Sequence, residues 1–337
     1  MRNTFKSTVL AATVLTGLMA ISPGAKARAF APGDLVVGTD YMGYNGLEAY
    51  SVSSNGQISQ LGGTSTSTAP VDMASTSTAV IYGSYMSGNV YAMSESGTQS
   101  TLATVTGTVV GIQTDAANNI FVSSENGGAY GINLTELSST GAVLSTKSFT
   151  MPSAGNVTTG NGTFATLSSN ESTLYVHNNG NLYGINVSTG ATTELYSYSS
   201  GVGSPIAVLP NGNLLFSNSV NEIQLNPNTG TVVSSTAVLN SAYSGLAVDT
   251  SNSFVYGATN GSGVVTYAAL SNLNSTAVYG GAYNTYGATI FGQYQFGNIQ
   301  TSSQTPAPEP ASAVLLVGML GMLAAAKYRR GKFPSAT

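Results

Sequence analysis

The chain contains one histidine, His177, and no cysteine, so any catalytic or metal-binding imidazole has to come from this residue. Imidazole serves as the base of serine hydrolases and as a ligand for metal ions. A catalytic arrangement needs partners, and no serine or carboxylate stands at a spacing that identifies one. His177 comes directly before Asn178-Asn179-Gly180, a sequence typical of a turn. We therefore predict that His177 is a solvated turn residue, and we assign no catalytic residue.

Three aspartates, Asp72, Asp115 and Asp249, follow short apolar segments at one place in a repeated pattern. Two interpretations are open. A ring of carboxylates would supply the oxygen ligands that calcium prefers. Alternatively, each Asp stands two or three residues before Asn or Ser and caps a tight turn with its own side chain. No Asp-x-Asp-x-Asp-Gly calcium loop is present, so we favour the turn interpretation and predict neither a metal nor another cofactor.

These residues lie in a chain that repeats one unit several times. Its clearest copy runs from Gly180 to Gly190, alternates as a strand does and ends in a Gly-containing turn. Related copies lie at residues 46–56, 88–97, 128–134, 222–230 and 265–270. A second pair of strands precedes the copies, at residues 71–82, 111–122, 164–176, 205–216 and 245–257. The full unit is four strands that recur at about 40 to 55 residues, the period of a propeller blade.

This period predicts an all-β fold, a β-propeller over residues 30–300, with six blades favoured. The first copy lacks one lead-in strand that the other copies have, and a spare one stands at residues 287–292. We expect that strand to complete the first blade and close the ring. Seven blades are the alternative, because residues 138–162 could contain further strands. The repeat resembles quinoprotein-type and NHL-type propeller repeats, but it lacks the tryptophan of quinoprotein blades, so the resemblance implies no quinone cofactor.

The N-terminus has the three parts of a secretory signal peptide. Arg2 and Lys6 form a positive region, residues 8–21 form an apolar core, and small residues follow up to Ala27 and Ala29. The core is shorter than the roughly 20 residues that a permanent membrane anchor needs. We predict a signal peptide over residues 1–29, cleaved after Ala27 or Ala29.

The C-terminus combines a proline-rich linker, a short apolar stretch and a basic tail. The linker, residues 301–310, ends in Pro308-Glu309-Pro310. Residues 311–326 carry no charge and predict a single transmembrane helix of about 24 Å, shorter than the hydrocarbon core of about 30 Å. Residues 327–337 predict a cytoplasmic tail, because positive charge marks the cytoplasmic end of a membrane helix.

These three parts, in this order, resemble the PEP-CTERM sorting signal of Gram-negative bacteria that make extracellular polysaccharide. The resemblance rests on the motif and the basic tail, namely Pro308, Glu309, Pro310, Lys327, Arg329 and Arg330. It implies that an exosortase-like membrane transpeptidase is a partner and cleaves near the motif. It also implies transient anchoring in the inner membrane, followed by delivery to the outer envelope, the biofilm matrix or the medium.

The charge of the body excludes one class of partner. Between Phe30 and Thr305, Lys147 is the only Lys or Arg, against twelve Asp and Glu, which gives a net charge of −11. Nucleic acid binding depends on cationic contacts with phosphate, so we predict no nucleic acid partner. The 19 tyrosines and the many Ser, Thr, Asn and Gly residues suit a neutral polysaccharide, although Tyr also packs within and between blades.

Two functional classes remain open from the sequence. The favoured one is a non-enzymatic matrix or surface protein that uses its propeller as a scaffold, adhesion or glycan-binding module, with extracellular polysaccharide as a partner. The alternative is a secreted propeller enzyme, a lactonase-like hydrolase or a polysaccharide lyase, with carboxylates at the channel rim and a divalent metal. Convergence of Asp and Glu on the propeller axis would distinguish the two.

Overall fold

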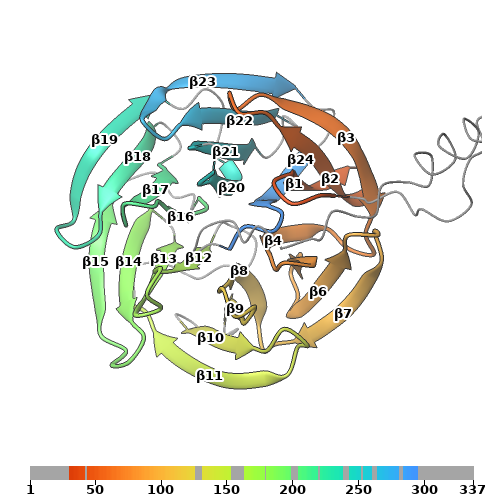
Figure 1. Cartoon of the computed structure of the whole chain (residues 1–337). Coiled ribbons are helices and arrows are strands. Elements are labelled where there is room, and N and C mark those ends of the chain that lie inside the picture. The colour runs from red at the N-terminus through yellow and green to blue at the C-terminus, as the bar shows by residue number, and fades with distance from the viewer. Residues whose placement is uncertain are drawn as a thin grey trace, which may run out of the picture.

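The computed structural model describes residues 30–294 except 42–43, 126–130, 153–162, 179, 199–203, 219–220, 238–242, 252, 260–263 and 281–283. The described residues form 24 β-strands in six four-stranded sheets and contain no helix. The sheets stand as blades around a common axis (Figure 1). The protein is a six-bladed β-propeller, which confirms the predicted all-β fold.

The strands of each blade run in order from an innermost strand beside the axis to an outermost strand at the rim. Blade 1 contains β24 (Asn284–Ile290), β1 (Leu35–Tyr41), β2 (Tyr44–Val52) and β3 (Ile58–Ser65). Blade 2 contains β4 (Pro70–Ser75), β5 (Ala79–Ser84), β6 (Asn89–Ser94) and β7 (Gln99–Thr104). Blade 3 contains β8 (Thr108–Thr114), β9 (Ile120–Glu125), β10 (Gly131–Leu137) and β11 (Val143–Thr150).

The other three blades follow the same order. Blade 4 contains β12 (Phe164–Leu167), β13 (Thr173–Asn178), β14 (Asn181–Asn186) and β15 (Thr192–Ser197). Blade 5 contains β16 (Ala207–Val208), β17 (Leu214–Ser217), β18 (Asn221–Asn226) and β19 (Thr231–Ala237). Blade 6 contains β20 (Tyr243–Asp249), β21 (Phe254–Thr259), β22 (Val264–Ala269) and β23 (Asn272–Gly280).

The last strand closes the ring. β24 pairs antiparallel with β1 from Leu35↔Ile290 to Asp40↔Asn284. It is therefore the innermost strand of the blade that the N-terminal part of the chain begins (Figure 1, blue beside red). This confirms the predicted closure by the segment around residues 287–292. The seven-bladed alternative is wrong, because β11 is the outermost strand of blade 3 and the described strands make six sheets.

The repeat has one structural meaning throughout the ring. Its alternating segment forms the third strand of every blade, namely β2, β6, β10, β14, β18 and β22. The preceding pair forms the two inner strands. The turn after the third strand contains a glycine with a left-handed backbone, as at Gly97 (φ 75°) and Gly190 (φ 73°).

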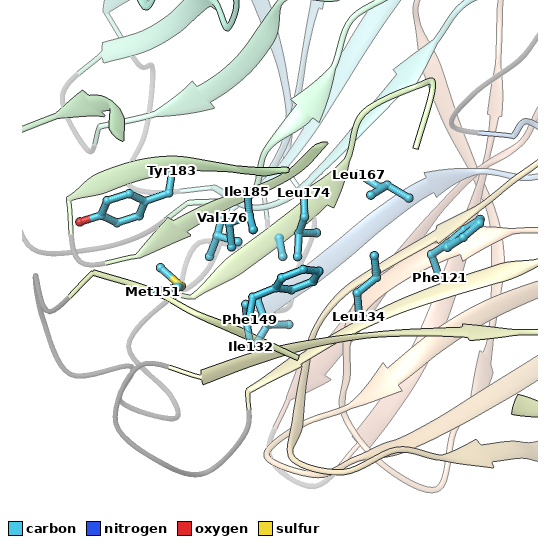
Figure 2. Packing of buried hydrophobic residues seen from close by; sticks show 12 residues of the cluster. Phe121, Ile132, Leu134, Phe149, Met151, Leu167, Leu174, Val176, Tyr183 and Ile185 are labelled. Atoms are coloured by element: carbon cyan, nitrogen blue, oxygen red, sulfur yellow. The ribbon is translucent and has the colours of Figure 1, made fainter. Parts of the chain in front are cut away.

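The hydrophobic core is divided into six clusters, one at each interface between blades. Alternation along a strand sends neighbours to opposite interfaces: Tyr82 packs toward blade 1 and Ile81 toward blade 3. Figure 2 shows the cluster between blades 3 and 4, where Phe149 lies near Leu174 and Ile185. Burial of each such side chain stabilises the fold by about 1.5–3 kcal/mol, so the interfaces hold the ring together.

The predicted terminal segments lie outside the described residues. These are the signal peptide with Ala27 and Ala29, the linker 301–310, the helix 311–326 and the tail 327–337. The sorting residues Pro308, Glu309, Pro310, Lys327, Arg329 and Arg330 lie there as well. Within the part of the chain that is described, no helix is long and apolar enough to cross a membrane.

Candidate functional site

A channel of about 440 Å³ lies along the propeller axis, and the innermost strands of all six blades contribute to its wall. Most of the lining side chains are aliphatic or aromatic, such as Ile112, Phe164 and Ile206. Among the described lining residues Asp72 is the one acidic side chain, and Gln113 and Gln293 are the amides. A concave apolar site with a few convergent polar groups is the usual form of a small-molecule site.

Asp72 lies on β4, at a β-bulge between Pro70 and Met73. Its Oδ2 accepts a hydrogen bond from the backbone N–H of Ile112 in the next blade, with an N···O distance of 2.6 Å. Burial raises the pKa of Asp72 to about 7, while hydrogen bonds from the backbone of Ile112 and Met73 act in the opposite direction. The carboxyl group therefore changes charge near neutral pH, as functional carboxyls often do.

Other blades carry glycine where blade 2 carries Asp72. Gly111 and Gly245 stand four residues before Asp115 and Asp249, as Asp72 stands before Thr76. Both glycines lie at bulges where neighbouring innermost strands nearly touch. A Cβ atom at Gly111 would overlap the backbone oxygen of Ala165, and one at Gly245 would overlap the backbone of Gly287. Blade 2 thus places a carboxylate at a point of the channel wall where these blades have no side chain.

Gln113 is the second polar residue of the wall and is 1% exposed. Its Nε2 donates a hydrogen bond to the backbone oxygen of Ala165 at 3.1 Å. Its Oε1 has no hydrogen-bond partner among the described residues. A buried acceptor without a partner costs about 1–3 kcal/mol, so this enclosed oxygen reduces the stability of the fold and is not exposed to the channel.

The segment that follows β24 crosses one end of the channel. Gln293 donates from Nε2 to the backbone oxygen of Val248, and its Oε1 accepts from the N–H of Thr250 at 3.2 Å. Tyr294 is 1% exposed and donates from its hydroxyl to Oδ1 of Asn118 at 3.0 Å. These bonds tie the end of the described chain to blades 6 and 3, at the end where innermost strands turn back.

Asp115 and Asp249 are turn residues, as the favoured interpretation predicts. Oδ1 of Asp115 accepts hydrogen bonds from the backbone N–H of Asn119 (2.7 Å) and Ala117 (2.9 Å). Oδ1 of Asp249 accepts one from Ser251 N–H (3.0 Å). The grouping of Asp72 with them is wrong, because Asp72 lies inside a strand.

In blade 2 the turn position belongs to Thr76, whose Oγ1 accepts a hydrogen bond from the N–H of Ala79 at 3.0 Å. The three aspartates are therefore not one ring of equivalent oxygen ligands. In the described part of the chain, no three His, Cys, Asp or Glu side chains stand close enough together to hold a metal ion.

The predicted environment of His177, a solvated turn, is wrong. His177 lies within β13 and is fully buried, not in a solvated turn. Its Nδ1 lies 2.9 Å from both the backbone N and O of Ser204, and its Nε2 lies 2.9 Å from the Tyr198 hydroxyl. Its ring packs edge-on against Phe216, with centroids 5.3 Å apart. Burial lowers the pKa of His177 to about 4, so the ring is neutral in the fold.

His177 and Ser204 do not form a nucleophile and base pair. Ser204 is buried, and its hydroxyl lies 3.4 Å from Nδ1 of His177. That hydroxyl already donates to the backbone oxygen of Ser217 and accepts from its N–H, both at 2.8 Å. A serine nucleophile needs an exposed hydroxyl that its base can deprotonate. The pair is a structural link between blades 4 and 5.

Glu125 and Glu222, two buried glutamates with raised pKa values, lie outside the channel, as does the buried Glu48. Glu222 on β18 is 5% exposed, and burial raises its pKa to about 7. Burial also raises the pKa of Glu125 on β9, against a hydrogen bond with Thr163 that lowers it. None of these glutamates lines the channel, so the described Asp and Glu residues do not converge on the axis.

The tyrosines are mainly packing residues, as the structural interpretation of their number expects. Buried examples are Tyr50, Tyr82, Tyr175, Tyr183, Tyr256 and Tyr294. Tyr85, after β5, is 47% exposed. Stacking on sugar rings requires an exposed ring, which the buried tyrosines do not have.

Comparison with known proteins shows the fold alone. Neither a family model nor a curated protein matches the chain. A chain of the nidogen/laminin complex is similar over 76% of this chain and 97% of its own, with a TM-score of 0.59 and 12% identity. A Bacteroides caccae protein of unknown function covers 77% and 98%, with a TM-score of 0.59 and 14% identity.

A Bacteroides fragilis protein, named as a candidate 6-phosphogluconolactonase, is similar over 76% of this chain and 96% of its own. Its TM-score is 0.51 and its identity is 13%. At these identities the likeness supports the propeller architecture, and the site has to be judged from its own residues.

Sequence reasoning missed Gln113 and misplaced Asp72. A signal for both was present, because the strand pairs that precede the repeat can be aligned on their turn residues Thr76, Asp115 and Asp249. In that alignment Asp72 occupies the position of Gly111 and Gly245, and Gln113 occupies the position of Ala74 and Ala247. A carboxylate where sister repeats have glycine is a departure from the repeat, and such departures mark candidate functional positions.

Proposed function

We propose that this protein is exported, sorted through its C-terminus to the outer envelope or the extracellular polysaccharide matrix, and acts there as a non-enzymatic propeller module. Its role is that of a scaffold, adhesion or glycan-binding unit. The observation that carries the proposal is the C-terminal sequence, Pro308-Glu309-Pro310 followed by a short apolar stretch and a basic tail. An exosortase-like transpeptidase is the implied partner.

The place of this motif relative to the propeller supports the proposal. The closing strand β24 ends at Ile290 and the described fold at Tyr294, so residues 295–307 separate fold and motif. A fully extended segment of that length spans at most about 45 Å. The propeller is complete before the motif begins, so cleavage there would release the whole domain.

Two features of the propeller favour a non-enzymatic role. His177, the one imidazole of the chain, is engaged at both ring nitrogens inside the core. Asp115 and Asp249 are engaged in turns, which leaves Asp72 as the acidic side chain in the described wall of the channel. Nucleophilic, acid–base and metal catalysis each need several groups that converge on one point.

The rim of the propeller favours a neutral, hydroxyl-rich partner. Many exposed positions on the outermost strands are Ser, Thr or Gln, for example Ser59 and Gln60 on β3 and Thr101 on β7. Exposed Leu and Val residues also occur on β3, β11 and β19. The Ser, Thr and Gln side chains donate and accept hydrogen bonds without a preference for charge. The similar chain of the nidogen/laminin complex belongs to a complex between proteins, which is consistent with a scaffold role.

Intact-mass analysis of the extracellular protein tests the sorting step. We expect a chain that begins after Ala27 or Ala29 and ends near Pro308 to Pro310. Replacement of Pro308 and Pro310 by Ala should leave an uncleaved chain in the membrane fraction, with an unchanged melting temperature of the propeller. Recovery of a secreted chain that still contains residues 311–330 would defeat the sorting proposal.

A sedimentation assay tests the non-enzymatic role. Purified propeller should co-sediment with the matrix polysaccharide and leave the length of the polysaccharide chains unchanged. Shortening of the polysaccharide, or metal-dependent hydrolysis of a lactone, would replace the scaffold proposal by the enzyme alternative.

A further inference from the structure

We propose that the axial channel binds a small organic cation, an ammonium group on an apolar body, with the carboxylate of Asp72 as its acceptor. This site is independent of the sorting signal and of the rim. It follows from the place of Asp72 in the wall of the channel and from the apolar side chains around it.

The carboxylate of Asp72 has no cationic partner available within the body of the protein. Between Phe30 and Thr305, Lys147 is the only Lys or Arg. Lys147 lies on β11, the outermost strand of blade 3, and its Nζ donates to the backbone oxygen of Val187 at 3.4 Å. His177 is enclosed at the interface of blades 4 and 5. A counter-ion for Asp72 therefore has to enter from outside.

The amide groups of the channel offer a ligand no free donor. The Nε2 groups of Gln113 and Gln293 donate to the backbone oxygens of Ala165 and Val248. Oε1 of Gln293 accepts from Thr250, and Oε1 of Gln113 is buried out of reach of a ligand in the channel. The charged acceptor in the described wall is Asp72, which is partly exposed. A ligand that donates hydrogen bonds and carries a positive charge, as an ammonium group does, complements this carboxylate.

The apolar walls of the channel favour a ligand in which an apolar body carries the ammonium group. Ile112, Phe164, Ile206, Leu246 and Ile290 belong to different blades and all line the channel. An apolar body buried among them gains hydrophobic free energy, whereas a polyol would lose its hydrogen bonds with water. A volume of about 440 Å³ lies in the usual range of sites for small organic ligands.

A metal ion fits this site less well than an ammonium ion. Calcium takes six to eight oxygen ligands, and several carboxylates usually supply its charge. The described channel wall contains one carboxylate, and one of its oxygens is already bound to Ile112 N–H. An ammonium group carries a single positive charge, which the one carboxylate of Asp72 balances.

Indole ligands give a direct test, because the chain contains no tryptophan and indole fluorescence reports the ligand alone. The probes are tryptammonium and its neutral analogue tryptophol, which share one apolar body. Fluorescence anisotropy at pH 8 should show that the wild-type protein binds tryptammonium at least tenfold more tightly than tryptophol. Asp72→Asn should lose at least tenfold in tryptammonium affinity and keep its tryptophol affinity, because removal of a charged partner costs more than removal of a neutral one.

A control variant and a pH series keep the test decisive. Glu194→Gln removes the same charge from an exposed position on β15 at the rim and should leave both affinities unchanged. Wild-type affinity for tryptammonium should fall between pH 8 and pH 5 while tryptophol affinity stays constant, because Asp72 gains a proton in that range, and this result does not depend on the folding of Asp72→Asn. Equal affinity for the two probes, no binding of either probe, or an unchanged Asp72→Asn overturns the proposal. Displacement of tryptammonium by calcium chloride at equal ionic strength overturns it in favour of a metal site.

Discussion

The carboxylate of Asp72 and the backbone N–H of Ile112 are joined across two blades by a hydrogen bond of 2.6 Å. Similar bonds follow around the channel. Thr114 Oγ1 donates to the backbone oxygen of Ser75 at 2.6 Å, and Ser75 Oγ donates to that of Ile290 at 2.8 Å. Innermost strands have a free edge toward the axis, and these side chains satisfy part of it. The polar residues of the channel therefore connect the blades as well as line the site.

Substitution of Asp72 should change how stability depends on pH. In the fold its pKa is about 7, against an ordinary value of 3.8. Between these values the folded state keeps a proton that the unfolded chain releases, so the free energy of unfolding falls as pH rises. Asn stays neutral and keeps an acceptor for Ile112 N–H. We expect Asp72→Asn to be more stable than the wild type by about 2 kcal/mol at pH 8, and nearly equal at pH 4.

Urea unfolding at pH 4, 6 and 8 measures this difference. Glu194→Gln, which removes an exposed charge from β15, is the control. Its free energy of unfolding should differ from that of the wild type by the same small amount at all three pH values. If Asp72→Asn were less stable than the wild type at pH 8, burial of the carboxylate would not be the cause of its shifted pKa.

Replacement of His177 should destabilise the propeller. His177→Ala removes a ring that packs on Phe216, together with its hydrogen bonds to the Tyr198 hydroxyl and the Ser204 N–H. The expected cost is about 3 kcal/mol at pH 7. The folded pKa is about 4 and the ordinary value is 6.5, so the unfolded chain binds more protons in that window. Wild-type stability should fall as pH drops from 6.5 to 4, and the gap to the variant should narrow.

Thermal unfolding of both proteins from pH 4 to 7 tests this account. Tyr198→Phe is the matched variant, because it removes the hydroxyl that bonds to Nε2 and keeps the ring; it should cost about 1 kcal/mol. A His177→Ala protein with the stability of the wild type would mean that the ring and its two hydrogen bonds contribute nothing to the interface.

A methyl group at Gly111 should strain the contact between blades 3 and 4. A Cβ atom there would overlap the backbone oxygen of Ala165, which cannot move without its strand. We expect Gly111→Ala to cost about 3 kcal/mol, at the upper end of the range for overpacking. Gly184→Ala is the matched control, since its Cβ would meet the flexible ends of Leu195 and Thr173 at 3.3 and 3.4 Å. Equal melting temperatures for the two variants would contradict the close approach.

The architecture was predictable because short segments of the sequence determine each of its strands and turns. Alternation of apolar residues and Gly-containing turns identify each third strand, and the spare segment at residues 287–292 identifies the closing strand. Each of these signals needs only a few neighbouring residues to be read. The turn roles of Asp115 and Asp249 were predictable for the same reason, since the N–H groups that they bind lie two to four residues away.

The environments of His177 and Asp72 depend on contacts between blades, and local sequence patterns do not predict such contacts. His177 resembles a turn residue in sequence, yet Ser204 and Phe216 of the next blade enclose it. Asp72 binds the N–H of Ile112, 40 residues away, and the bulge that directs it is visible only once β4 pairs with β5. The environment of such residues follows from the packing of neighbouring blades.

Removal of the closing strand should open the ring and unfold the protein cooperatively. β24 supplies Ala288 and Ile290 to the cluster between blades 6 and 1, and it supplies the backbone oxygen that binds Ser75. Without it, β1 would present an unpaired edge to the axis. A chain of residues 30–283 should therefore melt well below a chain of residues 30–297, and circular dichroism with differential scanning calorimetry measures both.

The chain of residues 30–297 separates the effect of removing β24 from the effect of removing the C-terminal segment. It keeps β24 and Tyr294, which bonds to Asn118 across the end of the channel, and lacks residues 298–337. Because those residues follow the closed ring, the chain of residues 30–297 should melt within about 2 °C of the protein that ends at Pro310, which is the shift that 1 kcal/mol produces in a domain of this size. If the chain of residues 30–283 melted at that same temperature, β24 would be dispensable, and closure of the ring would have to rest on contacts between the remaining innermost strands.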